Sequence, residues 1–78
     1  MASARQIRAA RALLGWSQQN LADRACLSLN AVVRLETGKA DTRLSTLTAI
    51  QEALVRAGVE FLPTGAKGEG VRLRDPAA

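Results

Sequence analysis

Apolar residues in the first 58 positions recur at intervals of three and four, which is the spacing of one face of an α-helix. The first such stretch follows Ser3, a residue type that caps helices, and runs to about Leu14 before Gly15 ends it. The helical spacing then restarts three times after short interruptions. The pattern therefore predicts four helices.

Two of the predicted helices are short and lie close together in the sequence. Ser17 is the expected cap of the second helix, and Ser28, after a brief break, is the expected cap of the third. The third helix runs to about Thr37 and stops at Gly38. The residues expected to face inward from these two helices are Leu21, Ala22, Ala25, Val32 and Leu35.

A fourth helix is expected to begin after a cap at Asp41 or Thr42 and to end at Gly58. Its apolar face is expected to carry Leu44, Leu47, Ile50 and Leu54, which recur at helical spacing.

Beyond the fourth helix the spacing changes from helical to alternating. Residues 59–62 and 71–74 alternate on either side of a glycine-rich stretch, a pattern typical of a β-hairpin. Residues 75–78 are expected to form a frayed end. The sequence thus predicts a mainly α domain over residues 1–58 and a C-terminal β-hairpin extension over 59–78.

The charge of the chain is unevenly distributed. The formal net charge is +4, with 11 basic and 7 acidic side chains. Residues 1–43 hold seven basic side chains and three acidic ones, whereas residues 44–78 hold four of each. This excess predicts an anionic partner that meets the first half of the chain.

The composition leaves little material for catalysis. The chain has no His, no Tyr and a single Cys, so acid–base and metal-ligand options reduce to scattered carboxylates and lysines. No enzymatic activity, metal or cofactor is therefore expected. No apolar run reaches the roughly 18 residues of a membrane span, and one cysteine calls for no oxidising compartment, so a cytoplasmic protein without a membrane partner is expected.

Two short helices with only a few residues between them match a helix-turn-helix. Around that turn, residues 17–22 read Ser-Gln-Gln-Asn-Leu-Ala, residues 27–28 read Leu-Ser, Val32 follows, and residues 35–39 read Leu-Glu-Thr-Gly-Lys. With this combination the chain, over roughly residues 5–58, resembles the phage repressor and Cro family, also called the xenobiotic response element family. The resemblance implies a four-helix repressor-like fold and a transcriptional repressor or regulator that binds a palindromic operator in double-stranded DNA as a homodimer.

The inward anchors of the third helix leave an outward face that fits the major groove, which admits one α-helix. That face carries Leu29, Asn30, Val33 and Arg34. Arg34 can donate two hydrogen bonds to a guanine, and Asn30 can pair with an adenine, while the two aliphatic side chains offer apolar contact to thymine methyl groups. The alternatives are that the aliphatic pair packs against a neighbouring helix or a partner protein, and that Arg34 contacts phosphate or stays solvated.

The residues expected to contact the DNA backbone are Ser17, Gln18, Gln19, Ser28, Thr37, Lys39 and Arg43. Gln18 and Gln19 stand where the resemblance implies phosphate contacts, at a helix N-terminus whose free N–H groups favour an anion. Lys39 and Arg43 flank the end of the third helix and would grip the backbone, unless they belong to a solvated basic loop. For Ser17, capping is the main role expected.

The resemblance also implies a partly buried ion pair. Related repressors pair an arginine of the first helix with the glutamate that ends the third, and Arg11 and Glu36 stand at the matching positions. Such a pair orients a helix more than it stabilises the fold. It would hold the third helix, with Arg11 also within reach of phosphate.

One residue departs from the family pattern. Cys26 stands in the turn where glycine is usual, because the backbone there often takes a positive φ. A side chain in that conformation costs on the order of 1 kcal/mol. We therefore expect the turn to be strained or differently shaped, and a redox-sensing thiol is not expected without a neighbouring His.

The hairpin offers an expected means of dimerisation. An exposed strand edge invites pairing with an identical chain, and two hairpins joined around a two-fold axis would bury both apolar faces. The residues expected at this interface are Val59, Phe61, Leu62, Val71 and Leu73. The alternative is that residues 59–78 merely cover the core of the monomer or remain flexible.

A different functional class stays open beside the DNA-binding regulator. Antitoxins and anti-activators use the same fold, so the chain could serve as a protein-interaction module that binds a partner protein. Salt-dependent binding to a palindromic operator would favour the regulator, whereas tight co-purification with a toxin or an activator would favour the interaction module.

Overall fold

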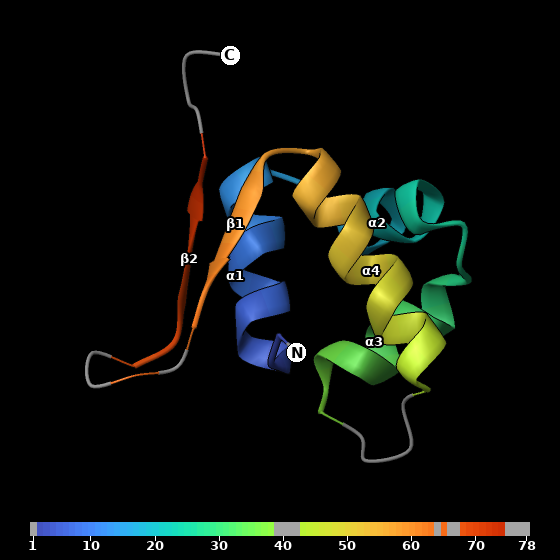
Figure 1. Ribbon diagram of the computed structural model, residues 1–78. Coiled ribbons are helices and arrows are strands. Elements are labelled where there is room, and N and C mark those ends of the chain that lie inside the picture. The colour runs from blue at the N-terminus through green and yellow to red at the C-terminus, as the bar shows by residue number, and fades with distance from the viewer. Residues whose placement is uncertain (1, 39–42, 64, 66–67, 75–78) are drawn as a thin grey trace.

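The computed structural model describes residues 2–38, 43–63, 65 and 68–74. Within them the chain forms four helices followed by a two-stranded antiparallel hairpin, so the predicted mainly α fold is confirmed (Figure 1). The elements are α1 (Ala4–Leu14), α2 (Gln18–Ala25), α3 (Leu29–Glu36), α4 (Leu44–Arg56), β1 (Val59–Leu62) and β2 (Gly70–Leu73).

Serine caps set the starts of the first three helices, as predicted. The hydroxyl groups of Ser3, Ser17 and Ser28 each accept the backbone N–H of the third residue of their helix, at 3.0–3.1 Å. In α1 and α2 the cap is reciprocal, because the side chains of Gln6 and Asn20 accept the backbone N–H of the capping serine. Each of these bonds satisfies a free N–H group at the start of a helix, and its two partners lie only three positions apart in the sequence.

The start of α4 differs from the prediction in two ways. Its N-cap residue is Arg43, which makes no side-chain cap hydrogen bond; the cap is therefore not Asp41 or Thr42, which lie outside the described residues. Leu44, predicted on the inner face, is 68% exposed. Leu44 and Ile50 are six residues apart, and at about 100° per residue their side chains point roughly 120° apart around the helix axis. When Ile50 faces the core, Leu44 therefore points away from it.

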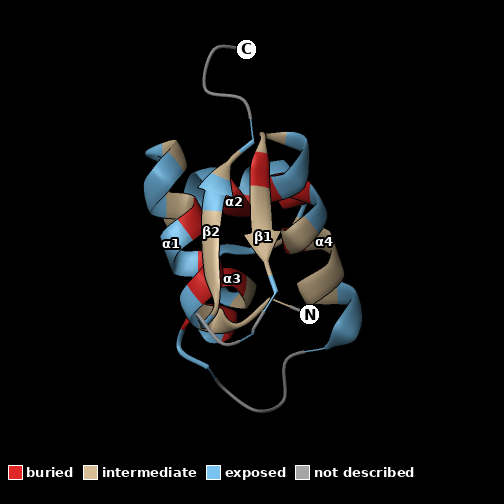
Figure 2. Ribbon diagram, turned by 60° about the vertical axis from the view of Figure 1, so that its left-hand side comes forward, coloured by how far each residue is buried: buried red, intermediate tan, exposed pale blue. Residues whose placement is uncertain are grey.

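The hairpin follows the prediction with a one-residue shift. Leu62 lies opposite Gly70 at the loop end of the antiparallel pair. β2 therefore begins and ends one residue earlier than the predicted 71–74, and Arg74 lies past the last strand pair, where its N–H donates to the carbonyl of Gly58 (2.7 Å). The hairpin lies across the first and last helices, with β2 against α1 and β1 against α4 (Figure 2).

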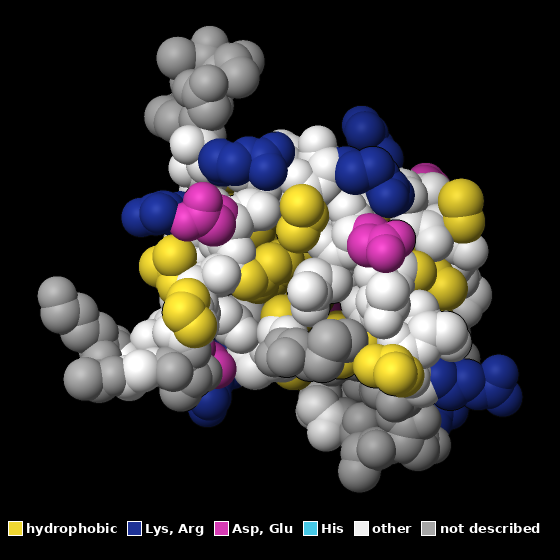
Figure 3. All heavy atoms as spheres, viewed as in Figure 1, with side chains coloured by type: hydrophobic (Ala, Val, Ile, Leu, Met, Phe, Trp, Pro, Cys, Tyr) yellow, Lys and Arg dark blue, Asp and Glu magenta, His cyan; other side chains and the backbone are white. Residues whose placement is uncertain are grey.

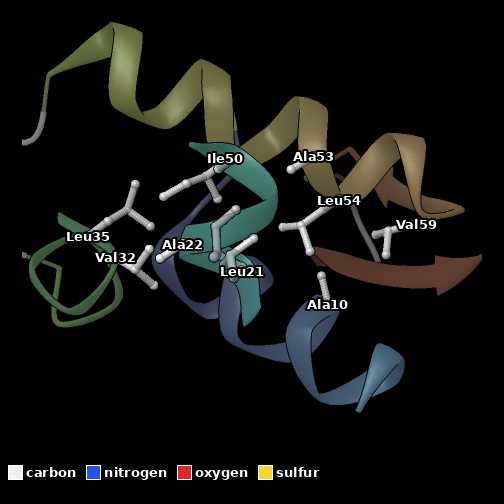
Figure 4. Close-up of a cluster of buried hydrophobic side chains, with 11 residues drawn as sticks. Ala10, Leu21, Ala22, Val32, Leu35, Ile50, Ala53, Leu54 and Val59 are labelled. Atoms are coloured by element: carbon white, nitrogen blue, oxygen red, sulfur yellow. The ribbon is translucent and has the colours of Figure 1, made fainter. Parts of the chain in front are cut away.

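The core is aliphatic and has α2 at its centre. Leu21 and Ala22 are fully buried and lie among side chains from α1, α3 and α4 (Figure 4). The buried hydrophobic residues are Ile7, Ala10, Leu21, Ala22, Ala25, Val32, Leu35, Ile50, Ala53, Leu54 and Val59. All five inward positions predicted for α2 and α3 belong to this set. Small alanines let the helices approach closely, which a chain of this length needs in order to bury a sufficient core.

Hydrogen bonds join the N-terminal end of α1 to the hairpin. The amide of Gln6 donates to the carbonyls of Leu62 (3.1 Å) and Gly70 (2.9 Å). Glu69, just before β2, accepts the hydroxyl of Ser3 (2.9 Å) and the guanidinium of Arg5 (2.8 Å). The hairpin is therefore tied to α1 by directional bonds as well as by apolar contact. In the described part of the chain, every helix is too short or too polar to cross a membrane.

The Glu69 ion pair leads to a prediction about pH. Hydrogen bonds from Arg5, and then from Ser3, hold the pKa of Glu69 below its usual value of 4.5. Because the pKa is lowered in the folded state, this stabilisation is present above pH 4.5 and is lost as the pH falls through the folded-state pKa. We expect Glu69→Gln to lower the free energy of unfolding at neutral pH and the deficit to vanish in acid. Urea unfolding of both proteins across this pH range measures it, and a deficit that grows on acidification contradicts it.

Candidate nucleic-acid interface

The turn between α2 and α3 consists of residues 26–28, the length typical of a helix-turn-helix. Cys26 has a φ of 58°, the one left-handed backbone among the described residues other than glycine. The next residue, Leu27, donates its N–H to the carbonyl of Ala22 (2.9 Å), which closes the end of α2. The strained turn expected from the cysteine is present, and it sends the chain directly into α3.

The outward face of α3 is the predicted one. Val32 and Leu35 are buried, and they fix the opposite side of the helix toward solvent. Asn30 and Arg34 are exposed, and Leu29 is 43% exposed although it is a large apolar residue. The remaining member of the predicted face, Val33, is half-buried. The four side chains thus form an accessible stripe on a helix of eight residues.

The ion pair predicted between Arg11 and Glu36 is formed. The guanidinium of Arg11 meets both carboxylate oxygens of Glu36, with Nε–Oε2 at 2.7 Å and Nη2–Oε1 at 3.0 Å. The third nitrogen of the Arg11 guanidinium, Nη1, donates to the carbonyl of Trp16 (3.0 Å). Glu36 is only 3% exposed, so this paired geometry compensates a carboxylate that has been removed from water.

Two further side chains converge on Glu36. The amide of Gln18, at the start of α2, donates to Oε1 of the carboxylate (3.1 Å). Arg8 donates from Nη1 to the backbone carbonyl of Glu36. The end of α3 is therefore held by α1 and α2 together. We call Arg8, Arg11, Gln18 and Glu36 the Glu36 cluster.

Sequence reasoning missed Arg8 and assigned Gln18 to DNA alone. Arg8 lies one helical turn before Arg11, and this i, i+3 spacing places two side chains on the same face of a helix. That spacing could have indicated Arg8 as a second contact to α3. No local signal indicated the bond from Gln18 to Glu36, because the two residues belong to different helices.

The other residues expected on the DNA backbone are exposed where the structure describes them. Ser17 and Ser28 use their hydroxyl oxygens as caps, which leaves the hydroxyl hydrogens available for donation. Gln19 donates to Asp23 on the same helix (2.9 Å), and Thr37 donates to the carbonyl of the residue three positions earlier (2.8 Å). Arg43 is exposed at the start of α4, and Lys39 lies outside the described residues.

The hairpin residues expected at a dimer interface are partly used within the monomer. Val59 is only 1% exposed, so its side chain has no surface left for a partner. Phe61, Val71 and Leu73 are half-buried and pack against the core. Leu62 is half-buried on the alternate face of β1. Hydrophobic side chains nevertheless reach the surface on the hairpin side of the molecule (Figure 3).

Two short helices joined by three residues, the second with an exposed face of polar and aliphatic side chains, define a helix-turn-helix DNA-binding domain. A family model described as helix-turn-helix matches residues 7–54, more than half of the chain. The chain therefore belongs to the Cro/C1-type helix-turn-helix family of DNA-binding transcriptional regulators. No curated protein matches the chain. Across the described residues there is no group of three or more His, Cys, Asp or Glu side chains that could hold a metal ion.

The left-handed turn residue gives a second prediction. A Cβ in this conformation costs about 1 kcal/mol relative to glycine, so Cys26→Gly should raise the free energy of unfolding by about that amount. Cys26→Ala is the matched control, because it removes the thiol but keeps the Cβ. Urea unfolding measures both variants. An equal gain from the alanine variant would mean that the thiol, and not the backbone conformation, is the source of the effect.

Proposed function

We propose that this protein is a sequence-specific transcriptional repressor that binds a near-palindromic operator as a homodimer. Residues 1–58 read and grip the DNA, and the hairpin extension over residues 59–78 joins the two copies. The observation that carries the proposal is the exposed stripe of α3, whose direction is fixed by the Glu36 cluster around its one buried carboxylate. A bound dimer would repress by covering the promoter DNA.

In this proposal α3 lies in the major groove. Arg34 donates two hydrogen bonds to O6 and N7 of a guanine, and Asn30 pairs with N6 and N7 of an adenine. Leu29 and Val33 contact thymine methyl groups, which gives a reason for a large aliphatic side chain to stay exposed. One such helix reads only a few base pairs, so useful specificity requires a second copy.

Contacts to phosphate would hold α3 in register. The first backbone N–H groups of α2, at Gln18 and Gln19, have no acceptor within their own helix, and the helix dipole favours an anion there. The hydroxyl of Ser28 and the side chains of Lys39 and Arg43 would extend this grip around the end of α3. The excess of basic side chains within residues 1–43 agrees with this orientation.

The outer edge of β2 supplies the dimer contact in this proposal. Opposed residues of an antiparallel pair alternate between pairs that are hydrogen-bonded to each other and pairs that are not. The N–H of Arg74 bonds to the carbonyl of Gly58, so the pairs that contain Val71 and Leu73 are not hydrogen-bonded, and these two residues direct their N–H and C=O groups away from β1. β2 is the outer strand, with β1 between it and α4 (Figure 1). Two β2 strands running antiparallel around a two-fold axis would satisfy these edge groups.

The reading role of Arg34 is tested by substitution. We expect Arg34→Ala to cost about 1–3 kcal/mol at one base pair of each half-site and to relax the preference there, because a bidentate contact to guanine is lost. The charge-matched control is Arg56→Ala, at the end of α4 that lies away from α3 (Figure 1). Affinities for a set of single-base operator variants, measured by fluorescence anisotropy at fixed salt, provide the comparison.

The outcomes of that measurement separate the alternatives. Equal weakening on all sequences would assign Arg34 to a phosphate and would contradict its reading role. Wild-type protein that binds every sequence alike, at any salt concentration, would contradict the repressor and favour the protein-interaction module.

The dimer contact is tested by a pair of substitutions at one strand position. Val71→Pro removes an N–H that points away from β1, so we expect the hairpin to survive and the dimer to dissociate. Val71→Ala loses more of the side chain but keeps the N–H, and it should stay dimeric. Sedimentation gives the oligomeric state, and circular dichroism confirms folding. If the two variants dissociate equally, or if neither does, pairing through the edge of β2 is wrong.

A further inference from the structure

We infer that α1 acts as the mechanical link between the dimer contact and the DNA-reading helix, and that Gln6 is the positioning residue at its hairpin end. This inference rests on the proposed dimer of DNA-binding regulators. It assigns to α1 the setting of the distance and the orientation between the two copies of α3. The DNA property that α1 would control is the preferred spacing of the two half-sites.

Gln6 is unusual among the polar residues of α1 because it is only 7% exposed. Its amide nitrogen donates to the carbonyls of Leu62 (3.1 Å) and Gly70 (2.9 Å), which face each other across the hairpin. Its amide oxygen accepts the backbone N–H of Ser3 (2.9 Å). The amide nitrogen of Gln6 thus binds the hairpin, and its amide oxygen belongs to the cap of α1.

The same helix holds α3 a turn further along. Arg8 donates to the backbone carbonyl of Glu36, and Arg11 pairs with its carboxylate. Gln6 and Arg11 are five residues apart, or about 7.5 Å along a helix. A single rigid helical segment of this length therefore carries directional bonds to the hairpin at one end and to the end of α3 at the other.

Directional bonds matter here because apolar contacts can slide. Apart from Gln6, the strands meet α1 and α4 through apolar side chains, namely Val59, Phe61, Val71 and Leu73, and apolar contact does not prescribe a direction. The bonds from Ser3 and Arg5 to Glu69 lie just before β2, and the Arg5 side chain is 77% exposed, so water screens that ion pair. A hydrogen bond weakens steeply when its geometry is distorted. Gln6 therefore fixes where the hairpin sits along α1. In a dimer joined through the hairpins, a small displacement at this point would be magnified at α3, on the far side of each copy.

The test compares two identical substitutions on different helices. Gln6→Met removes both donors, keeps an unbranched side chain of similar length and retains a good helix former. The control is Gln51→Met on α4, where the amide oxygen accepts the N–H of Ala2 (3.2 Å), a bond that does not involve the hairpin. Affinities are measured on one operator whose half-sites are separated by a series of spacers, together with affinities for an isolated half-site.

We expect wild-type protein and Gln51→Met to show one sharply preferred spacing. In Gln6→Met the preference for that spacing over its neighbours should fall by roughly fivefold or more, within the range of coupling between distinct sites. Affinity for the isolated half-site should not change. Arg8→Met, at the other end of the link, should broaden the spacing profile in the same way, and it provides the test if Gln6→Met does not fold.

Two results would overturn the inference while leaving the proposed function intact. One is a folded Gln6→Met protein, or Arg8→Met protein, with the spacing profile of the wild type. The other is a loss of affinity that is equal at all spacings and on the half-site, since that describes a purely structural role. Wild-type protein that shows no preference for spacing would instead overturn the proposed dimeric regulator, and this inference with it.

Discussion

One buried carboxylate governs the arrangement of this molecule. Glu36 ends α3 inside the protein and is contacted by side chains from α1 and α2. A buried charge that loses its partner costs several kcal/mol, so α3 cannot rotate or shift without leaving the carboxylate uncompensated. The outward direction of Asn30 and Arg34 follows from that constraint. The direction of the exposed face of α3 therefore depends on the ion pair of a residue that is itself buried.

Small side chains allow the helices to pack closely. Ala22 and Ala25 on α2 and Ala53 on α4 are buried where the helices meet. They allow close approach in a chain too short for a large core. The hairpin then covers the remaining apolar surface of α1 and α4, with Val59 completing the core. The two strands, which lie beyond the matched family segment, are thus part of the same folded unit rather than an appendage.

In the turn between α2 and α3, tertiary structure imposes a backbone conformation that the local residue disfavours. Cys26 takes a left-handed backbone that its side chain disfavours. The cap bond from Leu27 to Ala22 and the burial of α3 beyond the turn hold it there. A strain on the order of 1 kcal/mol is small beside the packing that depends on this turn. The resemblance to the family indicated the strain, because glycine is the usual residue at this position of the turn.

What the sequence by itself determined is local. Helix starts at Ser3 and Ser17 could be predicted because each cap bond closes within four residues, and inward faces follow from a 3.6-residue period. The tertiary structure decided which residues at helical spacing remain outside the core, as Leu44 does, and which groups distant in the sequence meet. The bond from Gln18 to Glu36 joins different helices, and Gln6 reaches carbonyls 56 and 64 residues away. Such contacts have no local signature, because a hydrogen bond depends on positions in space and those are set only when the core packs.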